Sequence, residues 1–165
     1  MAAMYEIRAH WDITMMVENA DDPSKTDAFI HCSSTSLKAA SPVFTAMVNG
    51  NWPESKTWSI RVQAWDIEAL LAFFRLIHGD GPLDLTRIDI TTLNVVFDMA
   101  NYYDSISLFD GYTMDLFLSQ TELLVSTPVP QLMEILYVAW TYRSPKLFRS
   151  ISSPIVNKSE GPITS

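Results

Sequence analysis

Three segments of the chain are predicted to be strands, and in the first and the third the hydrophobic residues occupy alternate positions, a period that is typical of strands with one buried face. These segments are residues 12–18, 27–32 and 57–63. The turn-forming run at residues 19–26 separates the first two, which predicts a hairpin. In the third segment Trp58, Ile60 and Val62 alternate with polar residues, so we expect them to share one face of the sheet. The pattern predicts a small three-stranded sheet.

Elsewhere hydrophobic residues recur every three or four positions, which predicts helices. The expected helices are residues 34–40, 42–48, 67–78, a segment that begins at 91 or 92, 108–118, a segment that includes 132–139, and 146–151. Ser41 and Asp66 can each accept the free amide hydrogens at a helix start. Pro42 suits a first helical position, and Gly79 suits the residue just after a helix. This order of elements indicates an α+β fold in which a helical majority packs on a small sheet.

The chain is acidic, with 19 Asp and Glu against 11 Lys and Arg among 165 residues, a net charge of −8. This balance argues against binding to nucleic acid or to an anionic membrane surface, because both attract clustered Lys and Arg. The sequence shows no secretory signal and no apolar run near the ~20 residues of a membrane helix. We therefore expect a soluble intracellular protein, in the cytoplasm or the nucleus.

Charge is unevenly distributed along the C-terminal half. Residues 84–140 carry eight acids and one base, a net charge of −7, whereas residues 141–165 carry a net charge of +3. Both stretches are consistent with solvated faces that keep the protein in solution. Alternatively, the basic end docks on the acidic helices, or the acidic helices meet a basic partner.

No residue pattern indicates a catalytic, metal or cofactor site. The histidines lack the spacing that places two ligands on one helix face, and no phosphate-binding loop or nucleophile elbow occurs. The one cysteine, Cys32, excludes an internal disulfide and is expected to be a small buried residue. His78 precedes Gly79, so we expect it near a helix C-terminus, where partial negative charge favours its protonated form. We predict a non-enzymatic protein without cofactor, metal or small-molecule substrate.

A set of short motifs occurs in a fixed order along the first two thirds of the chain. They are Asp12-Ile13, Leu37, Ser41-Pro42-Val43-Phe44, Met47 and Met99-Ala100-Asn101-Tyr102-Tyr103-Asp104. In this order and at this spacing they resemble the BTB/POZ domain family over about residues 12–118. The resemblance implies that Phe44 packs its helix against the hairpin and that Tyr103 closes the far side of the core. The short N-terminal segment and the helical C-terminal extension are similar to the stand-alone BTB/POZ proteins common in fungi.

The resemblance divides the chain into four parts. They are an N-terminal segment (1–11), the BTB/POZ domain (12–118), a C-terminal helical extension (119–152) and a tail (153–165). The tail is rich in Ser, Pro and Gly, so we expect it to be disordered.

The family implies a protein–protein interaction domain that mediates homo- or hetero-oligomerisation. Many members homodimerise and many are substrate adaptors of cullin-based ubiquitin ligases, so a second copy of the chain or a cullin is the expected partner. The N-terminal helix that members exchange is short or missing here, and the cullin-contacting motif is not evident after His78. Two alternatives stay open: a small acidic hydrolase that uses converged carboxylates, and a purely structural oligomerisation module.

The partner surface is expected on the acidic helical half and in the loop that follows His78. Its residues are Asp98, Asp104, Asp110 and Asp115, with Leu83 and Asp84 from the loop. If the domain dimerises, Asp12 and the N-terminal segment are expected at that interface. No catalytic residue is predicted, since the residues of the resemblance are ones that build the fold.

Overall fold

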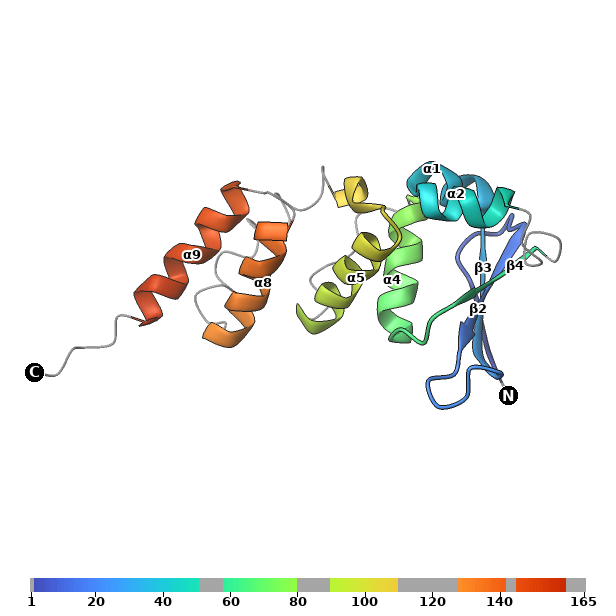
Figure 1. The fold of residues 1–165 in the computed structure, drawn as a ribbon, viewed down its shortest axis with the longest axis horizontal. Coiled ribbons are helices and arrows are strands. Elements are labelled where there is room, and N and C mark those ends of the chain that lie inside the picture. The colour runs from blue at the N-terminus through green and yellow to red at the C-terminus, as the bar shows by residue number, and fades with distance from the viewer. Residues whose placement is uncertain (1, 51–57, 80–89, 110–127, 142–144, 160–165) are drawn as a thin grey trace, which may run out of the picture. The chain divides into compact units, whose positions relative to one another are not determined.

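The computed structural model describes residues 2–50, 58–79, 90–109, 128–141 and 145–159 (Figure 1). The chain forms two compact units, Met1–Leu108 and Phe109–Ser165. Each unit is described by itself below.

The first unit contains a mixed four-stranded sheet with the strand order β1-β3-β2-β4. The strands are β1 (Ala3–Glu6), β2 (Ile13–Glu18), β3 (Thr26–Cys32) and β4 (Ser59–Val62). Strands β2 and β3 form the predicted antiparallel hairpin, while β1 pairs parallel with β3 and β4 pairs parallel with β2. The sheet therefore has four strands rather than the expected three. Strand β1 was not predicted because it is short and has no fully buried side chain, so its residues do not alternate between buried and exposed.

One face of the sheet forms part of the core of the first unit. Its buried hydrophobic side chains are Ile13, Met15, Val17, Ala28, Ile30, Cys32, Ile60 and Val62. Figure 1 shows the helices α4 and α5, whose bounds follow below, on one side of this sheet. Trp58 does not join the buried face: its φ of 52° breaks the strand alternation, and the residue is 58% exposed. The prediction that Trp58 shares a face with Ile60 and Val62 is therefore wrong.

The helices of the first unit lie close to their predicted positions. They are α1 (Ser34–Ala40), α2 (Pro42–Asn49), α4 (Ile67–His78), α5 (Ile90–Tyr102) and the 3₁₀ helix η1 (Ile106–Phe109). Ser41 Oγ accepts a hydrogen bond from the Phe44 amide at 3.0 Å, and Asp66 Oδ1 accepts one from the Ala69 amide at 2.9 Å. Gly79 ends α4 in the left-handed conformation, with a φ of 66°. The capping signals in the sequence are thus confirmed.

Aromatic side chains fill the space between α2, α4 and the end of α5. Phe44 is fully buried, and its ring centroid lies 6.4 Å from Phe73, 6.2 Å from Phe74 and 4.5 Å from Tyr103. The Ser41 hydroxyl donates a hydrogen bond to the carbonyl oxygen of Tyr103. Tyr103 thus closes this part of the core as predicted, whereas the ring contacts of Phe44 are with α4 and Tyr103 rather than with the expected hairpin.

The second unit contains two helices that pack on each other, α8 (Val129–Thr141) and α9 (Pro145–Ser159). Trp140 and Phe148 contact across them, with ring centroids 6.1 Å apart. Helix α9 extends beyond the expected end at residue 151 and into the tail that was expected to be disordered, because Ile155 continues the apolar spacing of Ile151 despite Pro154. Residues 160–165 and most of the helix predicted at 108–118 lie outside the described residues.

Candidate interaction surface

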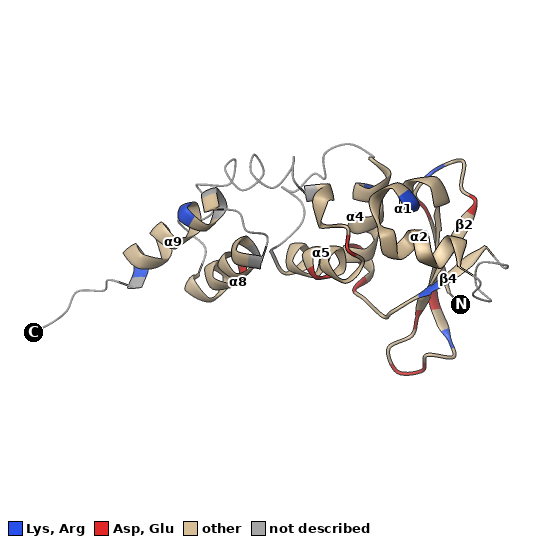
Figure 2. Cartoon of the chain, turned by 45° about the horizontal axis from the view of Figure 1, so that its top comes forward, with Lys and Arg blue, Asp and Glu red and all other residues tan. Residues whose placement is uncertain are grey.

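The structure describes three of the seven residues that the sequence placed at a partner surface. Asp12 precedes β2, Asp98 lies on α5, and Asp104 follows α5; all three are exposed. The other four predicted residues, Leu83, Asp84, Asp110 and Asp115, lie outside the described residues. Figure 2 shows acidic residues on α5 and just beyond it.

Asp12 is bound to the start of helix α1. Its Oδ1 accepts a hydrogen bond from the Ser34 amide, and its Oδ2 accepts one from the Ser34 hydroxyl, each at 2.6 Å. Partial burial would raise the pKa of Asp12, but the bonds from Ser34 outweigh it and hold the pKa below its usual value. The carboxylate thus stabilises the N-terminus of α1, where negative charge is favourable.

One face of α5 carries polar and aromatic side chains into solvent. Asp98, Asn101 and Tyr102 are three and four positions apart, so they share a face, and all three are exposed. The opposite face is apolar and buried; its residues are Leu93, Val96, Phe97, Met99 and Ala100. The helix therefore anchors the Asp98–Tyr102 face to the core.

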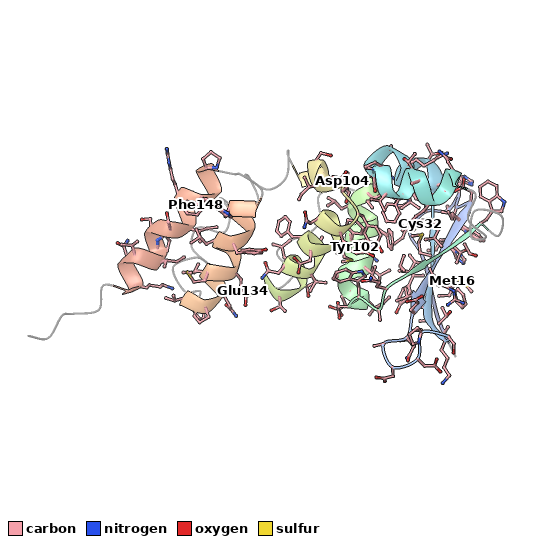
Figure 3. The ribbon with its side chains drawn as sticks, in the orientation of Figure 1. Met16, Cys32, Tyr102, Asp104, Glu134 and Phe148 are labelled. Atoms are coloured by element: carbon pink, nitrogen blue, oxygen red, sulfur yellow. The ribbon has the colours of Figure 1, made fainter. Side chains whose placement is uncertain are left out.

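Tyr102 is exposed but held in place on one side. Its hydroxyl accepts a hydrogen bond from Gln63 Nε2 at 3.2 Å, and its ring meets that of Trp65 edge-on, with centroids 6.1 Å apart. The ring also lies edge-on to the buried Tyr103, with centroids 4.9 Å apart. Tyr102 and Asp104 are labelled in Figure 3. We call Gln63, Trp65, Asp98, Tyr102 and Asp104 the acidic–aromatic surface.

Asp104 marks the turn that ends α5. Its φ is 48°, a left-handed value that Asp tolerates better than most residues, and its amide donates to the Asn101 carbonyl oxygen at 3.1 Å. The turn fixes the position of Asp104 relative to Tyr102. The sequence motif at 99–104 thus ends in a defined backbone conformation.

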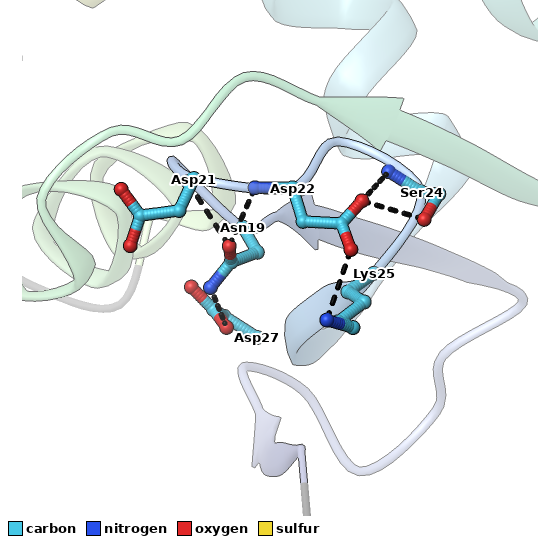
Figure 4. Close-up of polar contacts among 6 residues, drawn as sticks. All are labelled: Asn19, Asp21, Asp22, Ser24, Lys25 and Asp27. Carbon is cyan, nitrogen blue, oxygen red and sulfur yellow. Dashed lines mark hydrogen bonds and ion pairs between the residues drawn. The ribbon is translucent and has the colours of Figure 1, made fainter.

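The loop between β2 and β3 is held together by hydrogen bonds and one ion pair among its own residues (Figure 4). Asn19 Oδ1 accepts hydrogen bonds from the amides of Asp21 and Asp22 at 3.0 and 2.8 Å. Asp22 accepts from the Ser24 hydroxyl at 2.6 Å and pairs with Lys25 at 2.9 Å, and these contacts lower its pKa. Among the described residues, no group of three or more His, Cys, Asp or Glu could hold a metal ion.

His78 joins the end of α4 to the start of α1. Its Nδ1 lies 2.6 Å from the Phe74 carbonyl oxygen, and its Nε2 accepts from the Ser33 amide at 2.8 Å. Because a backbone amide can only donate, Nε2 carries no proton and the ring is neutral, with Nδ1 as the donor. His78 does lie at the helix C-terminus, but the expected protonated form is wrong. The Arg8 guanidinium donates to the His78 carbonyl oxygen and supplies the positive charge that this helix end favours.

The described residues offer no arrangement for nucleophilic or acid–base catalysis. Cys32 is buried, and burial raises the pKa of its thiol far above the usual range. Among the described residues no Asp or Glu is buried, and the two carboxylates with a clear pKa shift, Asp12 and Asp22, are shifted downward. The hydrolase alternative requires converged carboxylates with raised pKa values. The described part of the chain contains no such cluster.

The fold, the capping contacts and the aromatic core agree with one finding from comparison with known proteins: the family model of the BTB/POZ domain matches residues 2–120. The chain belongs to the BTB/POZ domain family. No curated protein matches it significantly. A BTB/POZ domain is a protein–protein interaction module, and the family is generally non-enzymatic. The match begins at residue 2, so it includes β1 and most of the segment that the sequence motifs placed before the domain.

Sequence reasoning missed the contacts that prepare this surface. Nothing in the spacing of Gln63 and Tyr102 indicates that they meet, because their contact depends on how β4 and α5 pack. The same holds for Arg8 and His78, which lie 70 positions apart.

No described helix is long and apolar enough to cross a membrane.

Proposed function

We propose that this BTB/POZ domain is a non-enzymatic adaptor that binds a protein partner through the acidic–aromatic surface. Family membership supports an interaction role. One observation supports the location: Tyr102 is 51% exposed, yet Gln63 and Trp65 hold its ring from one side.

A pre-positioned aromatic side chain is well suited to anchor a partner. Tyrosine and tryptophan are enriched among the residues that dominate binding energies. A ring whose orientation is already fixed loses less conformational entropy on binding than a free one. Tyr102 and Trp65 would therefore form the centre of the contact.

The acidic residues beside this centre favour a basic partner. Asp98 and Asp104 are exposed, and the sequence of α5 contains no Lys or Arg. Complementary charge at the rim of an interface raises the association rate and excludes partners of like charge. A second copy of the chain would present the same acidic surface, so we propose hetero-association rather than self-association here. A cullin is the partner class that the family resemblance favours, which would place the protein in the cytoplasm or the nucleus.

Titration of a purified cullin from the same source organism into the full chain tests this proposal. We expect Tyr102→Ala to weaken binding at least ~10-fold, which corresponds to about 1.4 kcal/mol. The double variant Asp98→Asn/Asp104→Asn should weaken it ~3–10-fold, mainly by slowing association. Asn tolerates the left-handed conformation at position 104, so this variant should keep its fold.

A matched control distinguishes an effect of the acidic–aromatic surface on binding from an effect of the chain's net charge. The variant Asp21→Asn/Glu68→Gln removes two exposed acids elsewhere, from the β2–β3 loop and α4, and should bind like the unchanged chain. Equal weakening by the control would overturn the assigned location. Absence of cullin binding, together with a light-scattering mass of a dimer or larger assembly, would favour the structural oligomerisation module instead.

A further inference from the structure

We infer that the outer face of the sheet is a second docking surface, shaped for a basic amphipathic helix of a protein partner. This inference goes beyond the proposed function and concerns the sheet face opposite to the buried one. In Figure 3, Met16 lies on the side of the sheet away from α4, whereas Cys32 lies on the side of the helices.

The centre of this outer face is a row of apolar side chains. The strand register places Met4 beside Phe29, Phe29 beside Met16, and Met16 beside Arg61. Met4 is 70% exposed, and Phe29 and Met16 are partly exposed. The apolar row thus crosses β1, β3 and β2 and ends at a positive charge on β4. Two of its three members are methionines, whose flexible side chains adapt to a partner surface.

A neighbouring row is polar and carries one aromatic side chain stacked on it. Here the register places Glu6 beside His31 and His31 beside Thr14. Thr14 Oγ1 lies 3.1 Å from His31 Nδ1, and the indole of Trp11 stacks on the His31 ring with centroids 3.9 Å apart and planes 13° from parallel. The stack holds the half-exposed Trp11 next to the apolar row. Aromatic rings of this kind often contribute strongly to protein interfaces.

Acidic residues lie on both sides of the apolar row. Glu6 is two residues beyond Met4 along β1, and Asp27 is two residues before Phe29 along β3; both are exposed. Two residues span ~7 Å along a strand, so a carboxylate lies about that far from the row on each side. These charges favour a partner with Lys or Arg flanking an apolar stripe.

The spacing of the row suits a helix that lies across the strands. Adjacent strands are ~4.8 Å apart, close to the ~5.4 Å rise of one helical turn. A helix laid along the row could place one apolar side chain per turn against Met4, Phe29 and Met16. Its negative C-terminal end would suit the Arg61 end. A second copy of the chain would instead bring like acidic residues together, which is unfavourable.

A pair of synthetic peptides tests the inference on the full chain. Both are amphipathic helices with leucine at each turn, one with lysine and the other with glutamate on the flanks. We expect the lysine peptide to shift the methyl resonances of Met4 and Met16 but not of the fully buried Met15. The glutamate peptide should bind at least ~10-fold more weakly, because its charge repels Glu6 and Asp27.

Two variants and one control locate the binding. Met16→Thr/Phe29→Thr, which keeps strand-favouring residues, should abolish binding of the lysine peptide. If that variant loses its thermal unfolding transition, Glu6→Gln/Asp27→Asn carries the test, since it leaves the apolar row intact and should weaken binding ~3–10-fold. Asp98→Asn/Asp104→Asn, on α5 and in the turn that follows it, should bind the peptide unchanged, which keeps this test separate from that of the proposed function.

Three outcomes would overturn the inference. The first is equal binding of the two peptides. The second is a peptide response at the acidic–aromatic surface in place of Met4 and Met16. The third is a light-scattering dimer that Met16→Thr/Phe29→Thr dissociates, which would make a second copy of the chain the occupant.

Discussion

The ring of Tyr103, just after α5, stacks on the ring of Phe44 in α2, with centroids 4.5 Å apart and planes 18° from parallel. The Ser41 hydroxyl, at the start of α2, donates to the carbonyl oxygen of Tyr103, 62 positions away. These contacts tie the end of α5 to the capped start of α2. They also hold the backbone next to Tyr102, so the core supports the proposed partner surface.

Replacement of Phe44 by alanine should strongly destabilise the first unit. Phe44 is fully buried among three aromatic rings, and truncation of a core phenylalanine costs about 3–5 kcal/mol. Urea unfolding monitored by circular dichroism measures the loss. Val43→Ala, one position away and only partly buried, should cost less. An unchanged unfolding midpoint for Phe44→Ala would contradict the assigned packing.

Replacement of His78 by leucine should weaken the joint between α4 and α1. The change leaves the part-buried Ser33 amide without its acceptor, which should cost about 1 kcal/mol, the low end of the range for an unsatisfied buried donor. We expect faster hydrogen exchange at the Ser33 amide and a lower melting temperature. His10→Leu, at an exposed position, is the control and should leave both unchanged. Unaltered exchange at Ser33 in the His78 variant would show that the bond has no protective role.

Protonation of Asp12 in acid should lower the stability of the protein. The pKa of Asp12 is lower in the folded than in the unfolded state, so its contribution is fully present above the unfolded value of 3.8 and is lost as the pH falls through the folded value. The variant Asp12→Asn cannot titrate, so its melting temperature should fall less steeply between pH 5 and pH 3, a range set by the unfolded pKa. Asp21→Asn is the matched control. If the melting temperatures of the unchanged chain and the Asp12 variant fell equally between pH 5 and pH 3, this role would be refuted.

Cys32 should be unreactive in the folded protein. Burial raises the pKa of its thiol, and only the thiolate attacks thiol reagents. At pH 8 we expect negligible labelling of the native chain and complete labelling in guanidinium chloride. Because the sequence has one cysteine, the readout reports this position alone. Rapid labelling of the native chain would mean that β3 is not buried as described.

The sequence predicts those features whose cause is local. The hairpin follows from two strand-forming segments on either side of a turn, and the start of α2 follows from Ser41 and Pro42. Strand β1 has no fully buried side chain, so its place beside β3 depends on backbone pairing that no side-chain pattern records. Trp58 departs from its expected face because its own positive φ changes the direction of the backbone just before β4.

The candidate site was predicted only in part, because spacing along the chain does not record contacts between segments that are distant in sequence. Charge along the chain indicates Asp98 and Asp104 as exposed acids, and the structure confirms their exposure. The aromatic centre formed by Tyr102 and Trp65 depends on packing between segments distant in sequence, which spacing cannot reveal. The outer sheet face was missed because two of the three residues of its apolar row are Met4, from the unpredicted strand β1, and Met16, whose position in the alternation is a polar one.

The central claim is that this BTB/POZ domain binds a basic protein partner through the acidic–aromatic surface. Its most direct test is quantitative affinity capture from an extract of the source organism, with the unchanged chain, Asp98→Asn/Asp104→Asn and the control Asp21→Asn/Glu68→Gln as baits. We predict a partner that the unchanged chain and the control recover equally and that the α5 variant recovers at least ~3-fold less, a difference of about 0.7 kcal/mol. Equal recovery by all three baits would contradict the claim.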